Sequence, residues 1–125
     1  MTPQSSIAQR VRIDSIAGKS CLTHVFKGHL TKAEAQEHLR QQRLRMKSLG
    51  RPVIFVWDCR EMSSYESAAR LLWQAELSAL RGEIREAWVV SGSQLIRMGA
   101  SMLGMFGHFP IHTCSTMEDV LRRND

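Results

Sequence analysis

The run Val-Ile-Phe-Val-Trp at residues 53–57 limits the possible folds of this chain more than any other feature. Five consecutive apolar residues, most of them β-branched or aromatic, are typical of a strand that is covered on both faces. Such strands occur in parallel sheets, where the crossover connections place helices against the sheet. The run therefore predicts the central strand of an α/β sheet.

Two helices are predicted from capping boxes, in which a hydroxyl residue and a glutamate three positions later satisfy free backbone N–H groups at a helix start. Thr31 and Glu34 predict a helix that ends at Gly50. Ser63 and Glu66 predict a second helix over residues 63–82. Two further helices are expected over residues 93–107 and over residues 115–123, the last capped by Ser115 or Thr116.

The remaining strands complete an alternating pattern. Residues 7–14 alternate apolar and polar side chains, and with residues 21–30 they form an N-terminal hairpin. Further strands are expected at residues 86–91 and 109–114. Strands that alternate with helices imply a mixed, mostly parallel sheet with right-handed crossovers. The prediction is an α/β fold with about five strands, formed by residues 1–125 as a single domain.

Composition argues against several classes of function. The 125 residues carry a formal charge of +5, but lysine and arginine are scattered and no nucleic-acid-binding motif is present. The sequence contains no apolar run long enough to cross a membrane and no signal peptide, and its three cysteines read as reduced thiols. We therefore expect a cytoplasmic protein that binds neither nucleic acid nor a membrane.

No constellation typical of an enzyme or a cofactor site can be read from the sequence. Cys59 lacks a readable base, and no glycine-rich phosphate loop is present. His108, His112 and Cys114 would share one face of a strand, but a fourth metal ligand is not evident. We predict a protein without enzymatic activity, cofactor or metal. Asp58, at the end of the central strand, either binds a ligand or bonds backbone N–H groups of the following turn.

The predicted helix over residues 93–107 is apolar almost all round. One side must pack on the sheet, and exposed methionines on the other side would adapt to varied partners. Tyr65 on the preceding helix either packs on the sheet or joins this surface. The predicted partner surface consists of Tyr65, Arg97, Met98, Met102 and Met105.

The order of these elements resembles the STAS domains of anti-sigma factor antagonists, the SpoIIAA-like family. In that family a buried strand ends in Asp or Asn, and an acidic residue followed by a phosphorylatable serine comes eight residues later. Here Asp58 ends the strand, and the segment Glu-Ser-Ala-Ala-Arg-Leu-Leu begins eight residues on, at Glu66. The later segments VVSGSQLIRM, GMFGHFPIHT and STMEDVL also follow the family's order. Ala68 and Ala69 replace a hydroxyl residue and a glycine of the family's motif.

The resemblance implies a non-enzymatic signalling domain that binds a protein. The partner would be a regulatory kinase or an anti-sigma factor, or a second copy in a homodimer. Ser67 falls at the phosphorylated position, with Asp58, Ser63, Ser64 and Glu66 as its switch loop. The residues alone favour an ordinary first-turn serine, because Ser63 and Glu66 would form the capping box of the helix. The alternative function is the binding of a small apolar ligand or lipid, as in Sec14-like α/β proteins, although the chain leaves little room for a cavity beyond its core.

Overall fold

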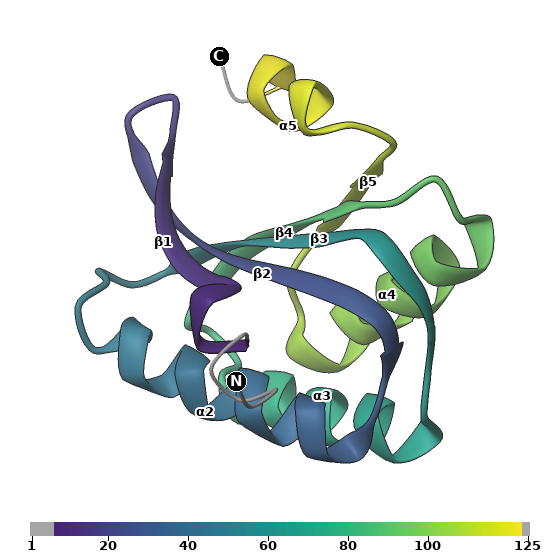
Figure 1. Ribbon diagram of the computed structural model, residues 1–125. Helices are drawn as coiled ribbons and strands as arrows, with labels where there is room; N and C mark the ends of the chain where they lie inside the picture. Colours follow the sequence, from purple (N-terminus) through teal and green to yellow (C-terminus); the bar gives the residue numbers. More distant parts are fainter. Residues whose placement is uncertain (1–6, 124–125) are drawn as a thin grey trace.

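The computed structural model describes residues 7–123 and places their strands in one sheet (Figure 1). The strands lie in the order β1-β2-β3-β4-β5, so each strand pairs with its neighbour in sequence. They span Val11–Ile16 (β1), Lys19–Leu30 (β2), Val53–Tyr65 (β3), Ile84–Val90 (β4) and Ile111–Cys114 (β5). The helices span Lys32–Met46 (α2), Ser67–Ala79 (α3), Gln94–Gly107 (α4) and Met117–Arg123 (α5).

The sheet is mixed, as the sequence predicts. β1 and β2 form the antiparallel N-terminal hairpin, whereas β2, β3, β4 and β5 run parallel to one another. Each parallel connection carries a helix, because a parallel pair cannot be joined by a tight turn. The mixed five-stranded α/β sheet expected from the sequence is therefore confirmed.

The two faces of the sheet are covered unequally. In Figure 1, α2, α3 and α4 lie on one side of the sheet and α5 lies on the other. Alternate residues of β3 follow this division: Phe55 and Trp57 belong to the larger core under α2, α3 and α4, whereas Ile54 and Val56 belong to the smaller core under α5. The run at residues 53–57 is thus buried on both faces, as predicted.

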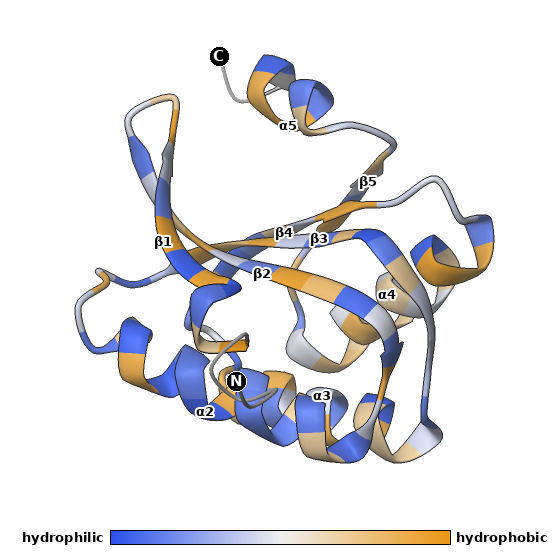
Figure 2. Ribbon diagram, in the orientation of Figure 1, coloured by the Kyte–Doolittle hydropathy of each residue, from blue (hydrophilic) through white to orange (hydrophobic). Residues whose placement is uncertain are grey.

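The helices on the larger face differ in polarity. Figure 2 shows α2 largely blue and α4 mostly orange to pale. α2 turns a polar side to solvent and is tied to α3 by an ion pair in which Arg43 Nη2 lies 2.7 Å from Glu76 Oε1. α4 keeps large apolar side chains on its solvent side, so its surface needs an explanation beyond packing on the sheet.

The N-terminal strand and the first helix are shorter than the sequence predicts. Residues 7–9 are helical and β1 begins only at Val11. The capping box of Thr31 and Glu34 is present, and α2 then ends at Met46 rather than at Gly50. Thr116 caps α5, since its hydroxyl accepts a hydrogen bond from the backbone N–H of Asp119. These differences lie at the ends of elements, where local propensity decides least.

The predicted capping box of Ser63 and Glu66 is wrong. β3 continues through Tyr65, and α3 begins at Ser67 with Glu66 as an N-cap whose side chain makes no capping hydrogen bond. The backbone pairs with β2 up to Tyr65 opposite Leu30, and sheet pairing therefore replaces the helical turn. Two register shifts in this pairing each add a residue to β3.

Candidate functional site

α4 presents two different surfaces to its surroundings. Ile96 and Leu103 point into the core and are buried. The opposite side carries Leu95, Met98, Met102 and Met105, which are 74%, 59%, 56% and 75% exposed. Their spacing of three, four and three residues places them in one stripe along the helix. Phe106 extends the stripe at 40% exposure.

The residues of the predicted partner surface do not all lie on the exposed side of α4. Met98, Met102 and Met105 lie on the exposed stripe, and the partly buried Arg97 lies beside it. Leu95 and Phe106 belong to the stripe although the sequence did not single them out. Tyr65 does not join it: its ring packs against the core and lines a hollow behind α4. The stripe is therefore apolar from its first turn to its last, with Arg97 at its edge.

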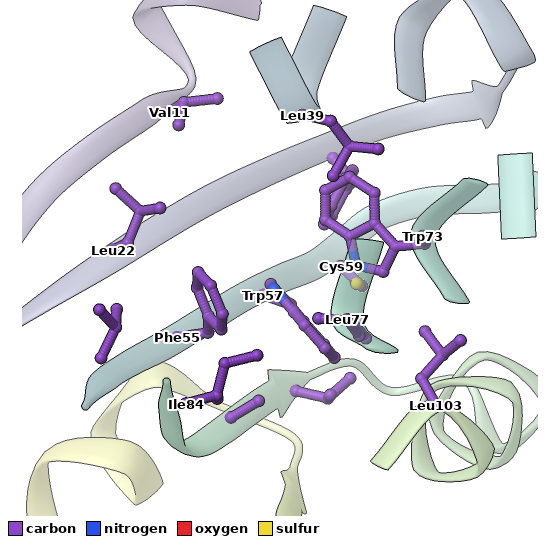
Figure 3. Packing of buried hydrophobic residues seen from close by; sticks show 14 of the residues in the cluster. Val11, Leu22, Leu39, Phe55, Trp57, Cys59, Trp73, Leu77, Ile84 and Leu103 are labelled. Carbon is purple, nitrogen blue, oxygen red and sulfur yellow. The ribbon is translucent and has the colours of Figure 1, made fainter. Parts of the chain in front are cut away.

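The hollow lies between the inner side of α4, the adjoining side of α3 and the ends of β2 and β3. It is half open to solvent and has a volume of about 60 Å³. Figure 3 shows Trp57 of β3, Trp73 of α3 and Leu103 of α4, which belong to its wall. Its accessible surface is almost entirely apolar. The lining residues are Phe26, Leu30, Trp57, Cys59, Met62, Tyr65, Ala69, Arg70, Trp73, Ile96, Gly99, Ala100 and Leu103.

Tyr65 connects the end of β3 to the middle of α4. A Cβ atom placed at residue 99 would lie 2.5 Å from the hydroxyl oxygen of Tyr65, so only glycine fits there without a shift. This close approach brings the segment before α3 against the helix that carries the exposed stripe. The register shifts of β3 make it possible, because they set which side chains near the strand end face the helices.

The predicted switch loop is not a loop. Ser63 and Ser64 lie in β3, where Ser64 Oγ is 2.6 Å from His29 Nδ1 on the neighbouring strand. Glu66 Oε1 accepts a hydrogen bond of 2.6 Å from the backbone N–H of Lys32, at the start of α2. Glu66 thus satisfies the first turn of a neighbouring helix instead of its own.

Ser67 is the first residue of α3, and its side chain is exposed. A phosphate at this position would lie near the positive end of the helix dipole, which favours negative charge. The carboxylate of Glu66 next to it would oppose that charge. Phosphorylation of Ser67 stays a prediction, with the hydroxyl accessible to a kinase.

Asp58 stands apart from the hollow and from the stripe. Trp57 and Cys59, its neighbours in β3, line the hollow, so Asp58 points to the other face of the sheet. Its two carboxylate oxygens accept hydrogen bonds of 2.8 and 2.7 Å from the Arg60 guanidinium, and the Arg60 backbone N–H donates a third. Burial raises the pKa of Asp58, but these bonds outweigh it and the pKa is lowered. Of the two roles that the sequence left open for Asp58, the hydrogen bond from the Arg60 backbone N–H matches the structural one.

A buried pair of histidines was not visible from the sequence. His24 of β2 and His38 of α2 are 0% and 1% exposed, and their Nδ1 atoms lie 3.0 Å apart. His24 Nε2 is 2.8 Å from Gln42 Oε1. Both imidazoles pack among the rings of Phe26 and Trp73. No local spacing in the sequence predicts such a pair, since the two histidines meet only when α2 packs on β2.

The cysteines and the possible metal ligands are the remaining groups that could take part in catalysis or metal binding. All three cysteines are buried, and burial raises the pKa of Cys59 to about 12, so its thiol stays protonated at neutral pH. In residues 7–123, no group of three or more His, Cys, Asp or Glu side chains is placed to hold a metal ion. No helix in that range is long and apolar enough to span a bilayer.

Comparison with known proteins gives a likeness of structure only. No family model matches the chain, and no curated protein matches it at a significant level. Among solved structures, it is similar to an uncharacterised protein of the DUF3478 family with a SpoIIAA-like fold, from Shewanella loihica PV-4. The TM-score is 0.76, the alignment covers 92% of each chain, and the sequence identity is 12%.

This likeness agrees with the order of elements in the sequence. At 12% identity it bears on the architecture and not on activity or partners. The hairpin, the parallel strands and the helices packed on the sheet are those of a single α/β sheet. The chain has the SpoIIAA-like, STAS-type fold that its sequence predicted.

Proposed function

We propose that this chain is a non-enzymatic, STAS-like regulatory domain that binds another protein through the exposed side of α4. The observation that carries the proposal is the stripe of Leu95, Met98, Met102 and Met105. Large apolar side chains gathered on one side of a surface helix are typical of interaction sites, since their exposure to water is unfavourable. The STAS-type fold supports the regulatory role by resemblance.

The spacing of the stripe suits another helix. Side chains three and four residues apart form the seam by which two helices pack side by side. Methionine fits this role because its flexible thioether adapts to the shape of different partners. The complementary surface would therefore be an amphipathic helix with an apolar face.

The charges around the stripe indicate what such a partner carries. α4 contains no acidic residue, Arg97 lies beside the stripe, and the whole chain has a net charge of +5. An acidic rim on the partner helix would complement this surface. A regulatory kinase or anti-sigma factor with such a helix fits the resemblance. A second copy of the chain fits if two α4 helices pack antiparallel, which separates the two Arg97 side chains along the axis.

Affinity capture from the native host tests the proposal directly. The tagged bait carries either the native stripe or the double substitution Met98→Glu and Met105→Glu. Leu44→Glu serves as the matched control, because Leu44 is an exposed apolar residue of α2 at 45% exposure and lies outside the stripe. Recovery of untagged chain would identify self-association, and recovery of another protein would identify a partner.

A further inference from the structure

The hollow behind α4 is an apolar surface that stays partly open to water. Its lining includes buried side chains, among them Trp57, Trp73 and Leu103. Its accessible surface is almost entirely apolar, and it is half open to solvent. Contact between apolar surface and water is unfavourable, and packed cores have few spaces larger than a water molecule. A group that fills the hollow and excludes water from it would therefore stabilise the complex to which it belongs.

The size of the hollow restricts what can fill it. One water-sized group needs roughly 10–15 Å³, so about 60 Å³ holds roughly four to six heavy atoms. The side chains of leucine, isoleucine and methionine are of this size, whereas a lipid chain or an indole ring is larger. Because the hollow is half open, the rest of the occupant lies outside it, on the surface of the protein. These two properties fit one aliphatic side chain that projects from a larger partner.

Gly99 joins the hollow to the exposed stripe. It lies four residues after Leu95 and three before Met102, so it is next to both on the helix surface. It also lies three residues after Ile96 and four before Leu103, and all three of these residues line the hollow. The stripe and the hollow therefore meet at Gly99, where α4 itself places no side chain between them.

Tyr65 forms the wall at this border. Its hydroxyl packs against Gly99, and its side chain lines the hollow and is partly buried. Neighbouring positions on a helix surface are about 5–6 Å apart. A helix that packs on the stripe is thus close enough for one of its side chains to reach past Tyr65 into the hollow.

We infer that the hollow is the anchor pocket of the partner-binding surface, and that it takes one leucine-sized aliphatic side chain from the amphipathic helix that packs on the stripe. This inference rests on the proposed function and names the residue type that the partner supplies. Helices that bind in surface grooves are held by a few apolar anchors, and a good interface seats such an anchor in a pocket. The stripe would provide contact area, and the hollow would select the side chain.

A small alcohol tests the pocket without any partner. 3-Methylbutan-1-ol carries the isobutyl group of leucine, and its hydroxyl can remain at the open side. In NMR titrations, the indole N–H signals of Trp57 and Trp73 should shift saturably, with a Kd of about 10 mM or tighter. The signal of Trp88, in the smaller core on the opposite face of the sheet, should not shift. Propane-1,2-diol, which is smaller and more polar, should shift none of them, and single Trp→Phe variants assign the three signals.

Ala100→Leu fills the hollow, and Ala75→Leu is its matched control. Ala100 lines the hollow and packs against the core, whereas Ala75 is exposed on α3. Ala100→Leu should abolish the shifts that the alcohol causes, and both Ala75→Leu and Met105→Glu should preserve them. Ala100→Met fills the same space with a more flexible side chain and is the second filling variant. An unchanged Trp88 signal shows that each variant keeps the fold.

Affinity capture then tests whether the partner uses the pocket. The Ala100→Leu bait should retain the partner of the native bait at least tenfold less well, while the Ala75→Leu bait should retain it fully. The stripe variant, Met98→Glu with Met105→Glu, tests the proposed function separately, because neither residue lines the hollow.

The inference is overturned by any of three results. One is the absence of saturable binding of 3-methylbutan-1-ol up to about 50 mM. Another is equal partner retention by the native bait and both filled baits when the stripe variant loses the partner, which would leave the proposed function standing. The third is full retention by the stripe variant, or no partner enriched by the native bait, which would remove the proposed function and this inference with it.

Discussion

The Nδ1 atoms of His24 and His38 lie 3.0 Å apart in the core, although 14 positions separate the two residues. A bond between two ring nitrogens requires one to donate and the other to accept. With His24 Nε2 donating to Gln42 Oε1, a neutral His24 accepts at Nδ1 and His38 Nδ1 donates. Both bonds require a neutral His24, because a proton on its Nδ1 would leave His38 Nδ1–H without an acceptor.

The first prediction concerns acid stability. Burial lowers the pKa of His24 to about 4 and that of His38 to about 2, whereas an unfolded histidine titrates near 6.5. Below pH about 6.5 the unfolded chain binds protons that the folded chain does not, so the free energy of unfolding falls as pH falls. Above that pH the contribution is complete. The slope should approach about 1.4 kcal/mol per pH unit for each histidine near pH 5, which lies between the folded and the unfolded pKa values.

Urea unfolding at several pH values between 7.5 and 5 measures this slope. His38→Gln removes one titrating group and should reduce the fall in the free energy of unfolding between pH 7.5 and 5 by about 2 kcal/mol in total. His29→Gln, at an exposed position of β2, is the matched control. Identical slopes in the native protein and His38→Gln would contradict this account of the pair.

The second prediction concerns the contact between Tyr65 and Gly99. Gly99→Ala should gain about 1 kcal/mol from helix propensity but lose more through the clash with the Tyr65 hydroxyl, for a net destabilisation of roughly 1–2 kcal/mol. In a Tyr65→Phe background the same substitution should be stabilising, since the remaining ring atoms lie at 3.4 Å or more from the new Cβ. A double-mutant cycle measures the coupling, and additive effects would refute the contact.

The third prediction concerns the thiols. Cys21, Cys59 and Cys114 are buried, and burial raises the pKa of both Cys21 and Cys59. Since the thiolate is the reactive form, a disulfide reagent at pH 8 should label none of them in the folded protein and all three in denaturant. Ser63→Cys places a thiol at an exposed position of β3 and should react at once. Prompt labelling of a native cysteine would count against the buried assignment.

The fourth prediction concerns Ser67. Because its side chain is exposed, Ser67→Ala should change the free energy of unfolding by no more than roughly 0.5 kcal/mol. Ser67→Asp imitates part of a phosphate's charge and should change partner affinity at least several-fold while the fold is kept. Binding by Ser67→Asp that equals native binding would remove Ser67 from the regulatory mechanism.

The fold was predictable from local patterns that agree with tertiary structure. The apolar run at residues 53–57 has no stable place except between two layers, and it is buried on both faces. The capping box of Thr31 and Glu34 was predicted and is present. In both places, the local preference and the packing of the whole domain point to the same structure.

The same motif failed at Ser63 and Glu66 because a competing interaction exists there. β2 offers partners as far as Leu30, and pairing with it extends β3 over the serines. Glu66 then bonds to the start of α2, a contact between residues 34 positions apart. The histidine pair and the hollow behind α4 were missed for a similar reason: their members come from separate elements and carry no common spacing.

The most direct test of the proposed function is the fraction of partner that each bait retains in affinity capture from the native host. The native bait and Leu44→Glu should enrich the same protein, either another chain or an untagged second copy. Met98→Glu with Met105→Glu should lose it at least tenfold, because two charges would be buried in an apolar interface. Equal retention by all three folded baits, or no specific enrichment by the native bait, would contradict the assignment of α4 as the partner-binding surface.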